Sequence, residues 1–185
     1  MNHFKKSKIL PLLVAGFFLN GVICALTFLI CGPSLDSALS CILISLLIPI
    51  SYIDYKTMKI APSLSAAVFA LGLVRTFVDF SDYPKHIIGM LSVSFLIFLL
   101  MVLSGGRAIG GGDLKLMAGI GLFFGWQEAM LCFVLACTAG AVCGLVRMRL
   151  KGKGKIFALA PYISLGVIIT VLFGERIIAS YVGYI

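Results

Sequence analysis

The chain has 185 residues, of which 61% are hydrophobic and only 12% carry a charged side chain. An ordinary soluble domain is about 45–50% apolar and about 25% charged. The composition therefore excludes a soluble globular enzyme, a disordered tail and a small secreted module held together by disulfides. It predicts an all-α integral membrane protein, a single transmembrane domain over residues 1–185 with about six or seven helices of ~20 residues each.

Seven apolar segments follow one another along the chain, and each is a candidate membrane helix. They cover residues 9–30, 37–53, 60–78, 86–103, 114–126, 127–146 and 156–179. The first is longer than the 7–15 apolar residues of a signal peptide and has no A-x-A cleavage site after it, so we expect it to remain as the first span.

The fifth segment, 114–126, is short for a membrane helix. Its thirteen residues would rise only ~20 Å, less than the ~30 Å of a hydrocarbon core. A re-entrant loop is the alternative, but it would place the basic run at 147–155 outside. We therefore expect a short helix in a thinned or protein-shielded part of the membrane, with Trp126 at its outer interface.

The basic residues indicate how the chain is oriented. Lys and Arg concentrate in cytoplasmic loops. With the N-terminus in the cytoplasm, eleven of the fifteen basic residues fall in the inner segments 1–8, 54–59, 104–113 and 147–155. The sequence therefore predicts a cytoplasmic N-terminus. In this setting the net charge of +8 indicates contact with anionic lipid, and no nucleic-acid partner is expected.

Of the seven acidic residues, only Asp54 and Asp113 fall on the cytoplasmic side in this topology. Both lie beside apolar sequence, where a charge is costly and a functional role is the default. Two carboxylates that meet share a proton, so that one can activate water while the other donates to a carbonyl oxygen. The alternative is that each carboxylate caps a helix or pairs with a nearby lysine.

A run of glycines directly precedes Asp113: Gly110, Gly111 and Gly112. Glycine allows a backbone or a substrate to approach closely, and a membrane protease must bind its peptide in an extended form. The run is therefore predicted to shape a site beside the carboxylate. Three further glycines are predicted to allow close helix packing: Gly119, Gly121 and Gly125.

Three motifs carry a resemblance to a known family. Residues 110–116 match G-x-G-D-x-K-[LM], the signature of the type IV prepilin peptidases, which belong to the GxGD intramembrane aspartyl proteases. Residues 54–60 resemble the family's first motif, D-x-x-T-x-x-I, although the proline that follows is displaced by one position. Residues 160–166 resemble its P-[FY]-x-x-x-G element, and the resemblance covers nearly the whole chain after the first span.

The resemblance implies a function and a site. Such enzymes remove the short basic leader from type IV prepilins and pseudopilins at the cytoplasmic face of the bacterial inner membrane. By this resemblance Asp54 and Asp113 are the catalytic pair, and Thr57, Lys115 and the glycine run bind substrate or shape the site. For Lys115, ion pairing with lipid or with an aspartate is the alternative.

No cofactor is expected. Many family members carry a cytoplasmic insert with two CxxC pairs and also N-methylate the mature pilin. Here the loop between the first two spans is about six residues long, and the chain contains no CxxC pair. The six cysteines are read as small hydrophobic residues, and His3 and His86 are far apart. The sequence therefore predicts a peptidase-only member that uses neither zinc nor S-adenosylmethionine.

Two other functions are compatible with a membrane protein of this kind. A proton- or cation-coupled transporter would use the Asp pair to carry ions, since broken helices and intramembrane acids are common in transporters. A pseudo-symmetric repeat would support it, and none is visible in the sequence. A non-catalytic assembly factor is the other alternative, and the intact Asp pair argues against it.

Overall fold

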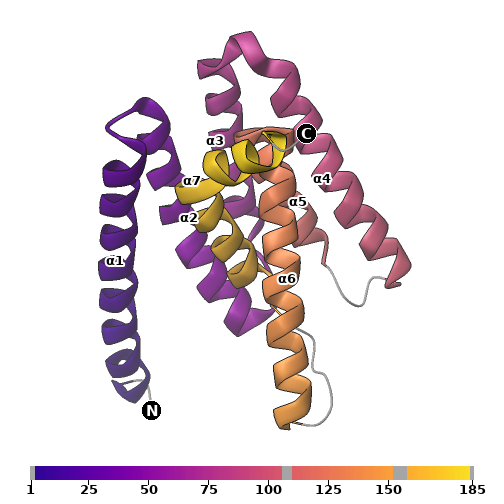
Figure 1. Ribbon diagram of the computed structural model, residues 1–185. Helices are drawn as coiled ribbons and strands as arrows, with labels where there is room; N and C mark the ends of the chain where they lie inside the picture. Colours follow the sequence, from indigo (N-terminus) through magenta and orange to yellow (C-terminus); the bar gives the residue numbers. More distant parts are fainter. Residues whose placement is uncertain (1–2, 106–109, 152–157, 184–185) are drawn as a thin grey trace.

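The computed structural model describes residues 3–105, 110–151 and 158–183, and over these residues the chain forms α-helices, one short 3-10 helix and no strand (Figure 1). The elements are α1 (His3–Cys31), α2 (Leu35–Thr57), α3 (Pro62–Val78), η1 (Phe80–Asp82), α4 (Tyr83–Leu103), α5 (Gly111–Phe124), α6 (Trp126–Lys151) and α7 (Ala160–Val182). The predicted all-α fold is confirmed.

The surface of the helices is suited to lipid. In the part of the chain that the structure describes, four segments are long and apolar enough to cross a membrane: Leu35–Thr57, Phe80–Leu103, Trp126–Val146 and Ala160–Tyr181. The helical stretches Gly16–Cys31 and Pro62–Val78 are apolar but shorter. Large side chains such as Leu29 and Phe77 are more than 70% exposed, which in water would be an aggregation hazard. The chain is therefore a polytopic membrane protein.

Helix α5 is short and lies inside the bundle. Its 14 residues rise about 21 Å, and it packs mainly against α3 and α4. Most of its residues from Leu116 to Phe124 are buried. The structure thus agrees with a short, protein-shielded helix at this position. Trp126 does not end this helix, because Gly125 adopts a positive φ of 84° that terminates α5, and Trp126 begins α6.

Glycines on α5 allow this close packing. A Cβ added to Gly119 would lie 2.9 Å from the backbone nitrogen of Phe69 on α3. A Cβ added to Gly121 would lie 2.6 Å from the carbonyl oxygen of Gly89 on α4. The predicted packing role is confirmed for these two glycines and also for Gly125, which ends the helix and whose added Cβ would lie 2.9 Å from the Lys85 Cγ on α4.

Local capping shifts several helix ends from the predicted positions. The α1–α2 connection is only residues 32–34, because Ser34 caps α2 by accepting a hydrogen bond from the Ser37 N–H at 3.1 Å. Helix α2 continues beyond the predicted residue 53 to Thr57. Helix α3 begins at Pro62 because proline suits the first helical position. The predicted start of the last segment, residue 156, is outside the described residues.

The two chain ends lie at opposite ends of the bundle (Figure 1). Helix α1 begins at the lower end in this view and α6 ends there, whereas α4, which leads into the inner segment 104–113, ends at about mid-height on the right. The described parts of the predicted inner segments 1–8 and 147–155 therefore lie at the same end of the molecule. The basic residues Arg107, Lys153 and Lys155 of the inner segments are outside the described residues.

Candidate active site

Asp54 is held near the end of α2, almost completely buried at 5% exposure. Its Oδ2 atom accepts a hydrogen bond of 3.1 Å from the backbone N–H of Ala160, the first residue of α7. A buried carboxylate is costly unless donors surround it. The start of α7 supplies such a donor from a part of the chain 106 positions away.

The turn after α2 is built by Thr57 and Met58. The Thr57 hydroxyl lies 2.8 Å from the carbonyl oxygen of Ile53 and 3.0 Å from that of Lys59. Met58 adopts a positive φ of 54°, uncommon for a residue with a side chain, and its N–H donates to the Asp54 carbonyl at 2.8 Å. This turn directs the chain from Asp54 toward α3.

Asp113 lies in the first turn of α5, outside the four segments long enough to cross the membrane. Its Oδ2 atom accepts a hydrogen bond of 3.2 Å from the Gly110 N–H. Its Oδ1 atom is buried and has no hydrogen-bond partner among the described residues. Burial raises the pKa of Asp113 to about 6, the Gly110 hydrogen bond opposes this effect, and the negative charge of Asp54 adds to it.

The two carboxylates line one cleft of about 600 Å³. Residues 53–54 and 57–62 form one wall, and residues 110–113 form the other. The walls meet where Ile60 covers Gly112, since a Cβ added to Gly112 would lie 3.1 Å from the Ile60 Cβ. The fold thus brings Asp54 and Asp113 together from distant segments. Their catalytic role stays a prediction.

The other predicted site residues divide into two groups. Those that line the cleft are Thr57, Gly110, Gly111 and Gly112. Lys115 is exposed and is not among the lining residues. Only Gly112 is closely covered in this conformation, whereas a Cβ on Gly111 would meet nothing within 4 Å. Substrate contact at Gly111 and any role of Lys115 stay predictions.

The capping alternative is partly correct, because Asp113 does cap α5 through Gly110. Capping leaves the second oxygen of this carboxylate without a partner. Within the described residues, the ion pairs involve Asp36 and Asp79 and neither cleft aspartate. In the same part of the chain, no group of three or more His, Cys, Asp or Glu side chains is arranged to hold a metal ion.

Two residues that the predicted site did not include have clear structural roles. Ile60 joins the two walls of the cleft, and its position at the end of the D-x-x-T-x-x-I motif was a signal for it. Ala160 acts through its backbone N–H. Nothing about an alanine side chain predicts that contact, although the resemblance at residues 160–166 marked the segment.

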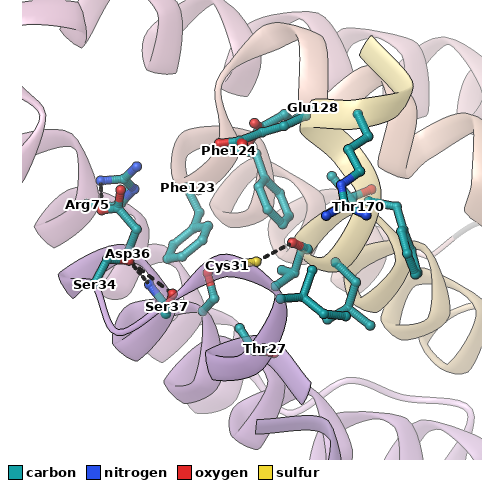
Figure 2. Close-up of a pocket in the computed structure, with 17 residues that line it drawn as sticks. Thr27, Cys31, Ser34, Asp36, Ser37, Arg75, Phe123, Phe124, Glu128 and Thr170 are labelled. Atoms are coloured by element: carbon teal, nitrogen blue, oxygen red, sulfur yellow. Dashed lines mark hydrogen bonds and ion pairs between the residues drawn. The ribbon is translucent and has the colours of Figure 1, made fainter. Parts of the chain in front are cut away.

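A second, smaller cavity of about 330 Å³ lies at the other end of α2 (Figure 2). It is lined by residues that include Asp36, Arg75, Glu128 and Glu175, and the carboxylate of Asp36 pairs with Arg75 at 2.5 Å. Asp36 and Asp54 are 18 positions apart along α2, about 27 Å at 1.5 Å per residue. Three of the five acids predicted for the outer side therefore gather far from the cleft.

Comparisons with known proteins agree on one family. The model of the type IV leader peptidase family matches residues 41–145, a stretch that begins before Asp54 and ends after Asp113. A prepilin leader peptidase/N-methyltransferase of Stutzerimonas stutzeri is 29% identical over 75% of this chain and 50% of its own length. Proteins of the same name from Pectobacterium carotovorum subsp. carotovorum and Pseudomonas putida are 30% and 29% identical over 78% and 92% of this chain.

The chain spans only about 50–60% of the length of these curated relatives. No solved structure matches it at a significant level. The family match covers more than half of the chain and includes both walls of the cleft. The chain belongs to the type IV leader peptidase family.

Proposed function

We propose that this protein is a membrane-embedded aspartyl endopeptidase. It removes the short basic leader from type IV prepilins or pilin-like proteins at the cytoplasmic face of the bacterial inner membrane. The observation that carries the proposal is that Asp54 and Asp113, the two acids predicted for the cytoplasmic side, line one cleft. Family membership supports the substrate class, since the relatives are named prepilin leader peptidases.

The cleft has the chemistry that peptide hydrolysis needs. Two nearby carboxylates do not readily ionise together, so one keeps a proton while the other is charged. The charged carboxylate takes a proton from water, and the protonated one donates to the carbonyl oxygen of the peptide. The open backbone at Gly111, where an added Cβ would meet nothing within 4 Å, leaves room in the cleft for an extended peptide strand. Neither a nucleophilic side chain nor a covalent intermediate is required.

Leader removal from a co-expressed pilin-like precursor tests the proposal. We expect the wild-type chain to cut the precursor, with the product scored by its shift on a gel. Asp54→Asn and Asp113→Asn should each abolish cleavage while the protein still accumulates in the membrane. Asp82→Asn is the matched control, because Asp82 lies in the 3-10 helix between α3 and α4, away from the cleft.

The outcomes separate this function from its alternatives. Normal cleavage by either cleft variant would show that the pair is not the catalytic machinery. Ion flux in vesicles without any cleavage would favour a transporter, which the comparisons do not support.

A further inference from the structure

We propose that the two carboxylates have fixed roles: Asp54 is the ionised general base and Asp113 the protonated general acid. We further propose that Ser51 and Ser164 are positioning residues, which keep Asp54 against the start of α7. The inference rests on the proposed function for its chemistry, but its protonation states are measurable without a substrate.

The start of α7 favours a negative charge on Asp54. The first N–H groups of a helix have no acceptor within the helix, and the helix dipole is positive at this end. Pro161 has no N–H, and the Ile163 N–H donates to Leu159 at 3.1 Å. Ala160 therefore supplies a free donor of this helix end, and it donates to Asp54 at 3.1 Å. An anion is stabilised at such a position.

A pair of serines holds α2 and α7 in the register that this contact needs. Ser51 lies one helical turn before Asp54, and Ser164 lies one turn after Ala160. Their Oγ atoms are 2.5 Å apart. Either oxygen can be the donor in this contact, and both hydroxyls also lie within hydrogen-bond distance of the Ala160 carbonyl oxygen, Ser164 at 3.0 Å and Ser51 at 3.5 Å. The pair thus joins the two helices one turn deeper in the bundle than the carboxylate.

Asp113 is in the opposite situation. One of its oxygens accepts from Gly110, but the other, Oδ1, is buried with no donor among the described residues. A buried oxygen without a donor is costly for an anion. A proton on Oδ1 removes the negative charge from this oxygen and gives the carboxyl group a hydrogen that it can donate to a substrate carbonyl.

Other charges around the cleft do not reverse this assignment. Besides the two aspartates, Lys59 is the charged or titratable residue among those that line the cleft. Tyr52, Tyr55, Lys56 and Lys115 lie within two residues of an aspartate along the chain, and Tyr162 lies two residues after Ala160. Positive lysines favour the ionised form of either carboxylate. What distinguishes the two aspartates is therefore their hydrogen-bond donors.

With these roles, each carboxyl group gives back every proton that it takes up during hydrolysis. Asp54 takes a proton from water as the water oxygen bonds to the peptide carbonyl carbon, and Asp113 gives its proton to the carbonyl oxygen. The C–N bond then breaks as the nitrogen takes the proton held by Asp54. Asp113 recovers a proton from a hydroxyl of the tetrahedral intermediate, and both carboxyl groups return to their starting states.

Infrared difference spectra of the purified chain in lipid test the roles directly. At pH 5, below the pKa of about 6 that burial gives Asp113, the wild type minus Asp113→Asn should show the C=O band of a protonated acid. The wild type minus Asp54→Asn should show a carboxylate band instead. The reverse pattern overturns the assignment, and so does a protonated-acid band lost in both variants. Since no substrate is needed, the result is independent of whether a prepilin is cleaved.

Serine variants test the positioning role. Ser164→Ala should lower kcat/KM about tenfold, as expected for the loss of a hydrogen bond that supports a charged group, and should move the acidic limb of the pH profile upward. Ser51→Ala should have the same two effects. The double variant should lower kcat/KM no further than either single variant does, because both remove the same contact. Ser51→Thr, which keeps a hydroxyl, should restore the profile.

The matched control is Ser94→Ala, which removes a buried hydroxyl on α4 that has no described partner. It should leave the pH profile unchanged. An unmoved acidic limb in Ser51→Ala and Ser164→Ala, or an equal shift in the control, would overturn the positioning role.

Discussion

Ile60 packs directly over Gly112, so that a Cβ atom added to the glycine would lie 3.1 Å from the Ile60 Cβ. This contact joins the turn that follows Asp54 to the glycine run that precedes Asp113. The contact lies between the two walls of the cleft that carry the two carboxylates.

Replacing Gly112 should therefore disturb the site without unfolding the protein. We expect Gly112→Ala to lower leader removal by roughly tenfold, since small misplacements of catalytic groups are costly, and Gly112→Val to lower it further. Gly144→Ala is the control, because a Cβ there would meet nothing within 4 Å. Equal activities of the Gly112 and Gly144 variants in the gel-shift assay would contradict this reading.

Gly121→Ala should destabilise the bundle itself. The new Cβ would lie 2.6 Å from the Gly89 carbonyl oxygen, and overpacking of this kind typically costs about 1–3 kcal/mol. Denaturation in detergent should show a lower free energy of unfolding than in Gly21→Ala, where the added Cβ has open space. Unchanged stability would mean that α4 and α5 are less closely packed than described.

Asp113 should make stability depend on pH. Burial raises its pKa from 3.8 to about 6, so the folded state binds a proton more tightly than the unfolded chain. The resulting stabilisation is fully present below about 3.8 and is lost as the pH rises through about 6. At about 1.4 kcal/mol per pH unit, it amounts to at most about 3 kcal/mol.

Unfolding measured from pH 4 to pH 7 should show this loss in the wild type and not in Asp113→Asn. A wild type and variant with parallel pH profiles would argue against a protonated Asp113.

The orientation can be measured by cysteine labelling in intact cells. Lys59 and Ser81 are exposed and lie before α3 and after it. A cytoplasmic N-terminus predicts that a membrane-impermeant thiol reagent labels Ser81→Cys from outside. The reagent should label Lys59→Cys only after the cells are permeabilised. Labelling of the unsubstituted chain measures the background from its native cysteines. The opposite pattern would place the cleft on the outer face.

Methyl transfer should be absent. The relatives are named peptidase/N-methyltransferases, but this chain contains no CxxC pair. We expect the purified protein to release a leader from a pilin-like precursor without moving radiolabelled methyl groups from S-adenosylmethionine to the product. A curated relative assayed in parallel provides the positive control, and a labelled product from this chain would defeat the prediction.

The sequence by itself determined that the chain is a helical membrane protein and which two aspartates are the candidate catalytic residues. These properties depend on hydropathy, charge sign and local motifs, each of which acts over a few neighbouring residues. Assigning each acidic residue to a side of the membrane singled out Asp54 and Asp113, the same two residues that the motif resemblance gives. A carboxylate beside apolar sequence is costly and therefore rare, so few residues could be candidates.

Only the tertiary structure decided which distant groups meet. The Ala160–Asp54 hydrogen bond joins positions 106 apart, and it depends on a backbone N–H that any residue except proline would offer. The cover of Gly112 by Ile60 depends on how closely α5 approaches α3, which Gly119 permits. Such contacts follow from the packing of whole helices, so the sequence motifs marked the segments involved but not which of their atoms meet.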